Sequence, residues 1–187
     1  MELAHESDER LMQRVAAGQR EALSVLLRRY ANSLLTFIHR MSVDHHRSEE
    51  LFQDVFLAVW SSAHKYKYPR PFRSWLFGIA VKKCLADRRG RPAVPAWIDQ
   101  RGQVAVVGRE AAPEEGAIAT ETATLVDQAV MELPVQRRTV VVMRIWNSFT
   151  YAEIANVLQC EESTVRSHMF HGLASLRKYL EPRMRSC

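Results

Sequence analysis

Apolar residues recur at spacings of three and four through most of the chain, which is the period of an α-helix. No stretch alternates apolar and polar residues as a half-buried strand would. The pattern therefore predicts an all-α protein. Its longest apolar stripe is wide enough to face a core and consists of Ala22, Leu23, Leu26, Leu27, Tyr30, Leu34, Ile38 and Met41.

The other amino-terminal helices are delimited by capping residues, glycines and prolines. A polar break at residues 43–46 separates the long stripe from the next helix, and Pro71 is a natural first helical residue. One expected helix is capped by Ser7 or Asp8 and ends at Gly18. A second is capped by Ser48 and ends near Ser62. A third runs from Phe72 to Arg89, with Gly90 as the stop.

The helical period is lost between residues 91 and 119. This stretch contains Pro92, Pro95 and Pro113 together with three glycines among small residues. An irregular stretch of this length is unusual inside one compact domain. We therefore expect a flexible linker at 91–119 that joins two helical domains, residues 1–90 and residues 120–187.

The second domain ends in a pattern typical of a helix-turn-helix. Helices are expected from Thr120 to Pro134 and from Val135 to about Asn147. Thr150 and Glu153 then form a T-x-x-E capping box ahead of a short apolar face. After a polar break, Glu162 or Ser163 would cap a second helix with the inward stripe Val165, Met169, Leu173, Leu176 and Leu180.

Two positions in this motif are unfavourable by local rules. Gln159 occupies the turn position where a glycine would adopt a left-handed backbone most easily. Gly172 inside the second helix costs about 1 kcal/mol relative to alanine, which indicates close packing or a kink there. Helical hairpins without a nucleic-acid role also exist, so this stretch alone leaves both alternatives open.

Charge is distributed unevenly along the chain. The formal net charge is +5, of which residues 1–91 carry +6, residues 92–119 carry −2 and residues 120–187 carry +1. Within the basic half, HKYKYPRPF at residues 64–72 mixes cations with aromatic rings. Pro69 and Pro71 exclude a continuous helix through this loop.

Other classes of protein lack support in the sequence. No apolar run approaches 18 residues, and the polar start is unlike a signal peptide, so we expect a cytoplasmic protein without membrane insertion. The three cysteines are widely spaced, which supports neither a disulfide framework nor a zinc knuckle. Asp44, His45 and His46 precede two glutamates but lack the spacing of a metal site, so we interpret them as a capped polar loop and expect no metal, cofactor or catalysis.

Four stretches, in this order, resemble the extracytoplasmic-function (ECF) sigma factors of bacterial RNA polymerase. They are EALSVLLRRYANSLLTFIHRM, SEELFQDVFLAVW, PRPFRSWLFGIAVKKCLADRRGR and LPVQRRTVVVMRIWNSFTYAEIANVL. The resemblance covers about residues 9–90 and 122–181. It implies a sigma region 2 domain and a sigma region 4 domain that bind core polymerase and promoter DNA. A stand-alone repressor with the same motif is the alternative, but it would not need the acidic SEELFQDVF segment.

The resemblance also implies roles for particular residues. The acidic helix docks on core polymerase, although Arg47-Ser48 stand where the family often has Asp-Ala. The following loop and helix melt the minus-ten element, and packing is at least as plausible for Tyr68 and Trp75. The implied core-binding residues are Glu50, Gln53, Asp54 and Leu57, and the implied minus-ten residues are His64, Lys65, Tyr66, Lys67, Arg70, Arg73, Lys82 and Lys83.

The second helix of the motif would read the minus-thirty-five element, with fewer cations than many members of the family have. Such proteins are usually sequestered by an anti-sigma factor, often at the membrane. We expect such a partner to cover exposed apolar residues at Leu57 and at Trp146 or Phe149. The implied minus-thirty-five residues are Ser163, Thr164, Arg166, Ser167, His168 and His171.

Overall fold

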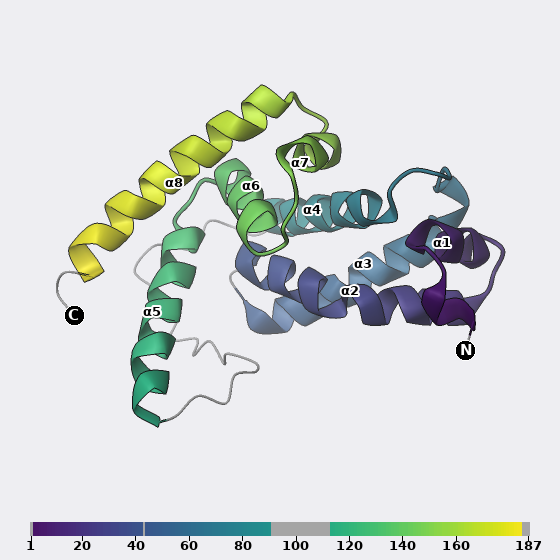
Figure 1. Cartoon of the computed structure of the whole chain (residues 1–187), viewed down its shortest axis with the longest axis horizontal. Helices are drawn as coiled ribbons and strands as arrows, with labels where there is room; N and C mark the ends of the chain where they lie inside the picture. The colour runs from purple at the N-terminus through teal and green to yellow at the C-terminus, as the bar shows by residue number, and fades with distance from the viewer. Residues whose placement is uncertain (1, 43, 91–112, 185–187) are drawn as a thin grey trace.

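The computed structural model describes residues 2–42, 44–90 and 113–184, and within these ranges every regular element is a helix. The prediction of an all-α protein is therefore confirmed for this part of the chain. Figure 1 shows the arrangement. The α-helices are α1 (Asp8–Ala16), α2 (Arg20–Met41), α3 (His45–Ser61), α4 (Phe72–Gly90), α5 (Pro113–Met131), α6 (Val135–Ile145), α7 (Tyr151–Leu158) and α8 (Glu162–Met184), and the short 3-10 helices are η1 (Glu2–His5) and η2 (Ala63–Lys65).

The first four α-helices pack together through α2, which contacts α1, α3 and α4. Most of its inward stripe is buried, as its spacing predicts, but Leu23 and Tyr30 are half-buried and Leu27 is 36% exposed. Phe37 of α2 meets Phe77 of α4 edge to face, with ring centroids 5.5 Å apart. Burial of this apolar surface is the main stabilising term for the bundle, at about 25 cal/mol per Å².

Several helix ends differ from the sequence expectation. Helix α3 begins at His45, because the Asp44 carboxylate caps it by accepting the His46 N–H at 3.0 Å. Ser48 is therefore not a cap, and its buried hydroxyl donates instead to the Asp44 carbonyl at 2.9 Å. The cap thus lies one turn earlier than expected, and His45 and His46, which were expected in a polar loop, belong to the first turn of α3. Helix α4 also includes Gly90, which was expected to stop it.

The carboxy-terminal helices begin earlier than expected as well. Helix α5 starts at Pro113, inside the stretch that was expected to be irregular, and a proline is well suited to a first helical turn. Residues 91–112 of the expected linker lie outside the described residues. Helix α8 starts at Glu162, so neither Glu162 nor Ser163 lies ahead of it as a cap.

Helix α8 packs along α5, α6 and α7, and Gly172 lies where it crosses α6. A Cβ atom at Gly172 would be 2.7 Å from the Cγ2 atom of buried Val141. This confirms close packing as the reason for a glycine within the helix. Leu173 was expected to point inward but is 44% exposed, because the neighbouring Gly172 makes the contact with α6.

We expect Gly172→Ala to lower the free energy of unfolding by about 1–3 kcal/mol, because the methyl group would overpack Val141. Gly78→Ala in α4 is the matched control, since a Cβ there meets nothing within 4 Å. The control should gain up to about 1 kcal/mol from helix propensity. Urea denaturation followed by circular dichroism measures both, and equal stabilisation by the two changes would contradict the close approach at Gly172.

Candidate functional site

Helix α3 presents four of the predicted residues on one side. Glu50 and Gln53 are exposed, Asp54 is half-exposed and the Leu57 side chain is 65% exposed. The opposite side of the helix is buried and includes Leu51, Val55 and Val59. Spacings of three and four place the four residues, Glu50, Gln53, Asp54 and Leu57, on one surface, which we call the α3 ridge.

Arginine and lysine side chains flank the acids of the α3 ridge. Arg47 forms an ion pair with Glu50 and another with Asp87 of α4, the latter at 2.6 Å. Hydrogen bonds to Glu50 and then to Asp87 raise the pKa of Arg47 above its usual value. The Lys83 ammonium lies 3.7 Å from the Asp54 carboxylate. The ridge is thus acidic but partly neutralised, with Leu57 as its exposed apolar residue.

The predicted minus-ten residues are not all equally available. His64, Lys65, Lys67, Arg70 and Lys82 are exposed, and Lys83 is half-exposed because it lies beside the α3 ridge. These side chains extend from η2, along the following loop, to the middle of α4. The structure therefore brings these cations to the outside of the amino-terminal bundle. The two remaining predicted minus-ten residues lie elsewhere.

One of these two is Tyr66. Its ring packs edge-on against Trp75 with centroids 5.2 Å apart, and its hydroxyl donates to the Arg70 carbonyl. Burial, and then the nearby Glu9 carboxylate, raise the pKa of Tyr66 to about 12. Tyr68, in contrast, is 52% exposed. The aromatic ring with an accessible face in this loop is therefore Tyr68, while Trp75 has the packing role.

The other exception is Arg73, which contacts the carboxy-terminal helices. Its guanidinium donates to the Asn147 carbonyl and lies 3.9 Å from the centre of the Phe149 ring. These two residues lie 74 and 76 positions further along the sequence. No local pattern signals this contact, because it arises only when the two halves of the chain pack together. Phe149 is fully buried and Trp146 is half-buried, so the expectation that one of them is exposed for a partner is wrong.

The helix-turn-helix has the local geometry that its sequence predicts. The Thr150 hydroxyl accepts the Glu153 N–H at 3.2 Å, and the Glu153 carboxylate accepts the Thr150 N–H at 2.8 Å. The hydrogen bond from the Thr150 N–H lowers the pKa of Glu153. Gln159 adopts the left-handed conformation, with φ 54° and ψ 49°, in place of the glycine that the turn favours. The Cys160 N–H donates to the Ala155 carbonyl at 3.1 Å and closes the end of α7.

The first half of α8 exposes most of the predicted minus-thirty-five residues. Ser163, Thr164, Ser167 and His171 are exposed, and His168 is half-buried. Arg166 is exposed but is held by Glu162 at 2.5 Å, and its guanidinium lies 4.8 Å from the Tyr151 ring centre. Val165 and Met169 anchor the opposite face. Small hydroxyl groups on an exposed helix can donate to and accept from base edges in the DNA major groove.

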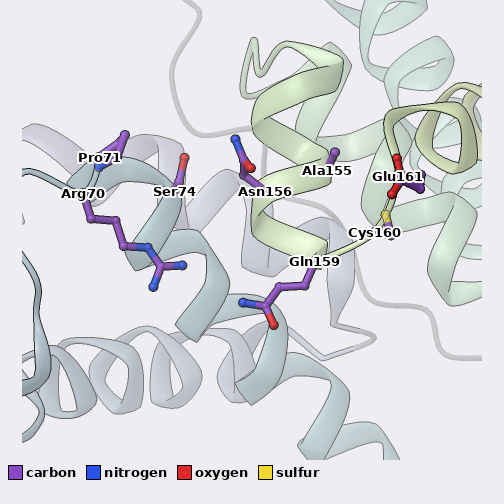
Figure 2. A pocket seen from close by; sticks show the side chains of 8 residues that line it. All are labelled: Arg70, Pro71, Ser74, Ala155, Asn156, Gln159, Cys160 and Glu161. Atoms are coloured by element: carbon purple, nitrogen blue, oxygen red, sulfur yellow. The ribbon is translucent and has the colours of Figure 1, made fainter.

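A hollow of about 800 Å³ lies between the start of α4 and the turn of the helix-turn-helix. Figure 2 shows Arg70 and Gln159 on opposite sides of it, and Asn156 extending from α7. Its walls come from positions about 80 residues apart, so the sequence pattern could not predict it. Its lining residues are Arg70, Pro71, Ser74, Ala155, Asn156, Gln159, Cys160 and Glu161.

Metal ligands and membrane spans are both lacking in the part of the chain that the structure describes. None of the His, Cys, Asp and Glu side chains there form a group of three or more that could hold a metal ion. None of the helices in residues 2–42, 44–90 and 113–184 is long and apolar enough to cross a bilayer.

Comparison with known proteins places both halves in one family. Residues 26–92 match sigma-70 region 2, and residues 123–176 match sigma-70 region 4. The chain is 29% identical to the RNA polymerase sigma-H factor of Pseudomonas aeruginosa, covering 98% of both chains. It is 30% identical over 174 residues to the ECF RNA polymerase sigma factor SigM of Mycobacterium tuberculosis, covering 93% of this chain and 85% of the relative.

Solved structures show the same fold at low sequence identity. CnrH in complex with the cytosolic domain of CnrY matches with a TM-score of 0.73 and 20% identity, covering 95% of this chain and 99% of CnrH. The sigma factor RpoE of Bartonella quintana, solved with the anti-sigma factor NepR, matches with a TM-score of 0.63 and 17% identity, covering 83% and 94%. Together with the two matched regions and the full-length relatives, these likenesses show that the chain belongs to the ECF sigma factors of the sigma-70 family.

Proposed function

We propose that this protein is an alternative sigma factor that binds core RNA polymerase and directs initiation at specific promoters, with no catalysis of its own. The observation that carries the proposal is the pairing of two exposed functional faces in one chain of this family. The α3 ridge offers acids around an apolar residue, and the first half of α8 offers small polar groups at the end of a capped helix-turn-helix. A repressor acting alone would need the second face and not the first.

The α3 ridge is the proposed contact with core polymerase. An apolar side chain that is 65% exposed, set among acids, suits a specific interface with a basic partner surface. Leu57 would supply buried apolar area in the complex, while Glu50 and Asp54 would steer the encounter. The ion pairs of these acids with Arg47 and Lys83 would have to rearrange, which weakens docking relative to an unpaired acidic ridge.

The cations after α3 are the proposed minus-ten contacts, and α8 is the proposed reader of the minus-thirty-five element. Exposed lysine and arginine neutralise phosphates, and the accessible face of Tyr68 can stack on an unpaired base. The α8 face holds hydroxyls and a histidine with one cation, Arg166, that is already paired with Glu162. We therefore expect weak DNA binding by the protein alone and specific binding with polymerase.

The proposed function places the protein in the cytoplasm, where polymerase and DNA are. We further propose that an anti-sigma factor regulates it, as the partners of the structurally similar CnrH and RpoE suggest. Such a partner, which could itself be held at the membrane, would have to cover the α3 ridge or the α8 face in order to block transcription.

Transcription with purified components tests the function. Core polymerase with this protein should initiate at promoters selected from the genome of its source, whereas core polymerase alone should not. DNA binding by the protein alone is measured in parallel. Tight, specific DNA binding without any polymerase-dependent initiation would favour the repressor, and absence of both core binding and initiation would reject the proposal.

A further inference from the structure

Helix α1 lies beside the loop that leads from η2 into α4, residues 66–71, which we call the α3–α4 loop. It contacts α2, η2 and α4, and Figure 1 shows it next to this turn of the chain. The match to sigma-70 region 2 begins only at residue 26, and none of the proposed core-binding or DNA-binding residues lies on α1. Three proposed DNA contacts in the α3–α4 loop, Lys67, Tyr68 and Arg70, are exposed within reach of it.

Helix α4 receives its amino-terminal cap from α1. The first N–H groups of an α-helix have no partner within the helix, and the residue ahead of α4 is Pro71, whose side chain cannot accept a hydrogen bond. The half-buried Glu9 of α1 supplies the acceptor, since its carboxylate binds the Phe72 N–H at 3.2 Å. A negative charge is also favourable at this end of a helix dipole. Glu9 is thus a cap supplied from 63 positions away in the sequence.

The Glu9 carboxylate also lies near the other end of the α3–α4 loop. Tyr66 starts this loop, and its ring lies 6.4 Å from that of Phe72, centroid to centroid. The hydroxyl of Tyr66 donates to the Arg70 carbonyl, and the Arg70 N–H donates to the Lys67 carbonyl at 2.9 Å. Glu9 is close enough to Tyr66 to contribute, after burial, to the raised pKa of its hydroxyl. Both ends of the loop therefore meet at one side chain of α1.

The neighbouring residue Asp8 fixes α1 to the bundle. Its carboxylate accepts from the Tyr30 hydroxyl at 2.5 Å and forms an ion pair with Arg29, and both partners belong to α2. The ring of Tyr30 in turn meets Phe72 edge to face, with centroids 5.5 Å apart. Glu9 is therefore held by the rigid part of the domain and does not depend on the loop for its own position.

We propose that Glu9 is a positioning residue for minus-ten recognition, which holds the α3–α4 loop in the shape that presents Lys67, Tyr68 and Arg70 to the DNA strand. It acts through the Phe72 N–H and touches no DNA itself. A loop that is already ordered binds more tightly, because less conformational entropy is lost on binding. The inference rests on the proposed function for this consequence, whereas the cap on α4 is a property of the chain alone.

Three substitutions of Glu9 separate its reach from its charge. Glu9→Gln removes the charge but keeps an oxygen that can accept the Phe72 N–H. Glu9→Asp keeps the charge on a side chain that is one methylene shorter, and Glu9→Ala removes both. Glu21→Ala is the charge control, since it removes one exposed acid from the first turn of α2.

The holoenzyme formed with each variant is titrated with a fluorescein-labelled single strand. This strand carries the non-template minus-ten sequence of a promoter selected in the transcription experiment above. Glu9→Ala and Glu9→Asp should weaken binding about fivefold, the effect expected for loss of a helix cap. Glu9→Gln should restore most of the affinity. Removal of an acid by itself favours binding to DNA, so an effect of charge alone would have the opposite sign in Glu9→Ala and in Glu21→Ala.

Two further measurements distinguish positioning from a general loss of structure. Affinity for core polymerase should be unchanged in all four variants, with normal helicity by circular dichroism. In the free protein, amide hydrogen exchange followed by nuclear magnetic resonance should be faster at Phe72 in Glu9→Ala and Glu9→Asp than in the wild type or in Glu9→Gln.

Three outcomes would overturn the inference. They are wild-type affinity of Glu9→Ala for the single strand, an equal loss in Glu9→Gln and Glu9→Ala, and a Phe72 amide that exchanges at the same rate in every variant. Failure of the proposed function has a different signature. The wild-type protein would then form no holoenzyme that binds the strand, while exchange at Phe72 would still respond to Glu9→Ala.

Discussion

Replacing Asp54 and Leu57 by arginine together should reduce affinity for core polymerase by about 100-fold or more. The change reverses one charge of the α3 ridge and removes its exposed apolar side chain. Juxtaposed like charges at an interface cost several kcal/mol, and each 1.4 kcal/mol is a factor of ten in affinity. The fold should survive, because Leu57 is 65% exposed and Asp54 is half-exposed. The arginine that replaces Asp54 would meet a small local penalty, since it approaches the ammonium of Lys83.

Fluorescence anisotropy of labelled protein titrated with core polymerase measures this effect. The double change of Glu21 and Leu27 to arginine is the matched control, since it also reverses one acid and removes one exposed leucine, on α2. The control should bind normally. If both double variants bind core polymerase as the wild type does, with normal helicity, the docking face lies elsewhere.

A second large effect is expected on α8. Thr164→Glu with Ser167→Glu should reduce promoter-dependent transcription on the order of 10²-fold or more while leaving core binding unchanged. Both side chains are exposed on the proposed reading face, and loss of each good base contact costs about 1–3 kcal/mol before repulsion from phosphates is added. Glutamate near the amino-terminal end of a helix is favourable, so α8 should stay folded.

Run-off transcription at a promoter with an intact minus-thirty-five element gives the readout. Gln13→Glu with Ser24→Glu adds the same two charges at exposed positions of α1 and α2 and serves as the control. The control should transcribe normally. Equal losses in the two double variants would point to a general effect of charge on the complex, and no loss in either would exclude α8 as the reader.

The helices and their caps could be predicted from the sequence because they depend on neighbours within one or two turns. The stripe from Ala22 to Met41, the Thr150–Glu153 capping box and the close approach at Gly172 all follow from residues three or four apart, or from a glycine where none is favoured. The errors at this level are shifts of a helix end and single residues assigned to the wrong face, such as Leu173. At α3, for example, the N-cap is Asp44, one turn before the expected Ser48.

The assignment to the sigma-70 family likewise came from the order of local motifs, each spanning at most about two dozen residues. Those motifs also brought the four residues of the α3 ridge together, since a single helix fixes their common side. Their roles in binding polymerase and DNA remain predictions for the experiments above.

The sequence by itself thus determined the helices, their amphipathic faces and the family. Only the tertiary structure decided which polar and aromatic side chains are exposed. Tyr66 packs against Trp75 while Tyr68 is exposed, and Arg73 contacts Phe149 across the two domains. The reason is physical. A helical period records which face of a helix is apolar. Burial at a contact between residues more than 70 positions apart depends instead on how well the two surfaces fit and on the balance of polar atoms without partners, like charges and apolar area. No local pattern encodes that balance.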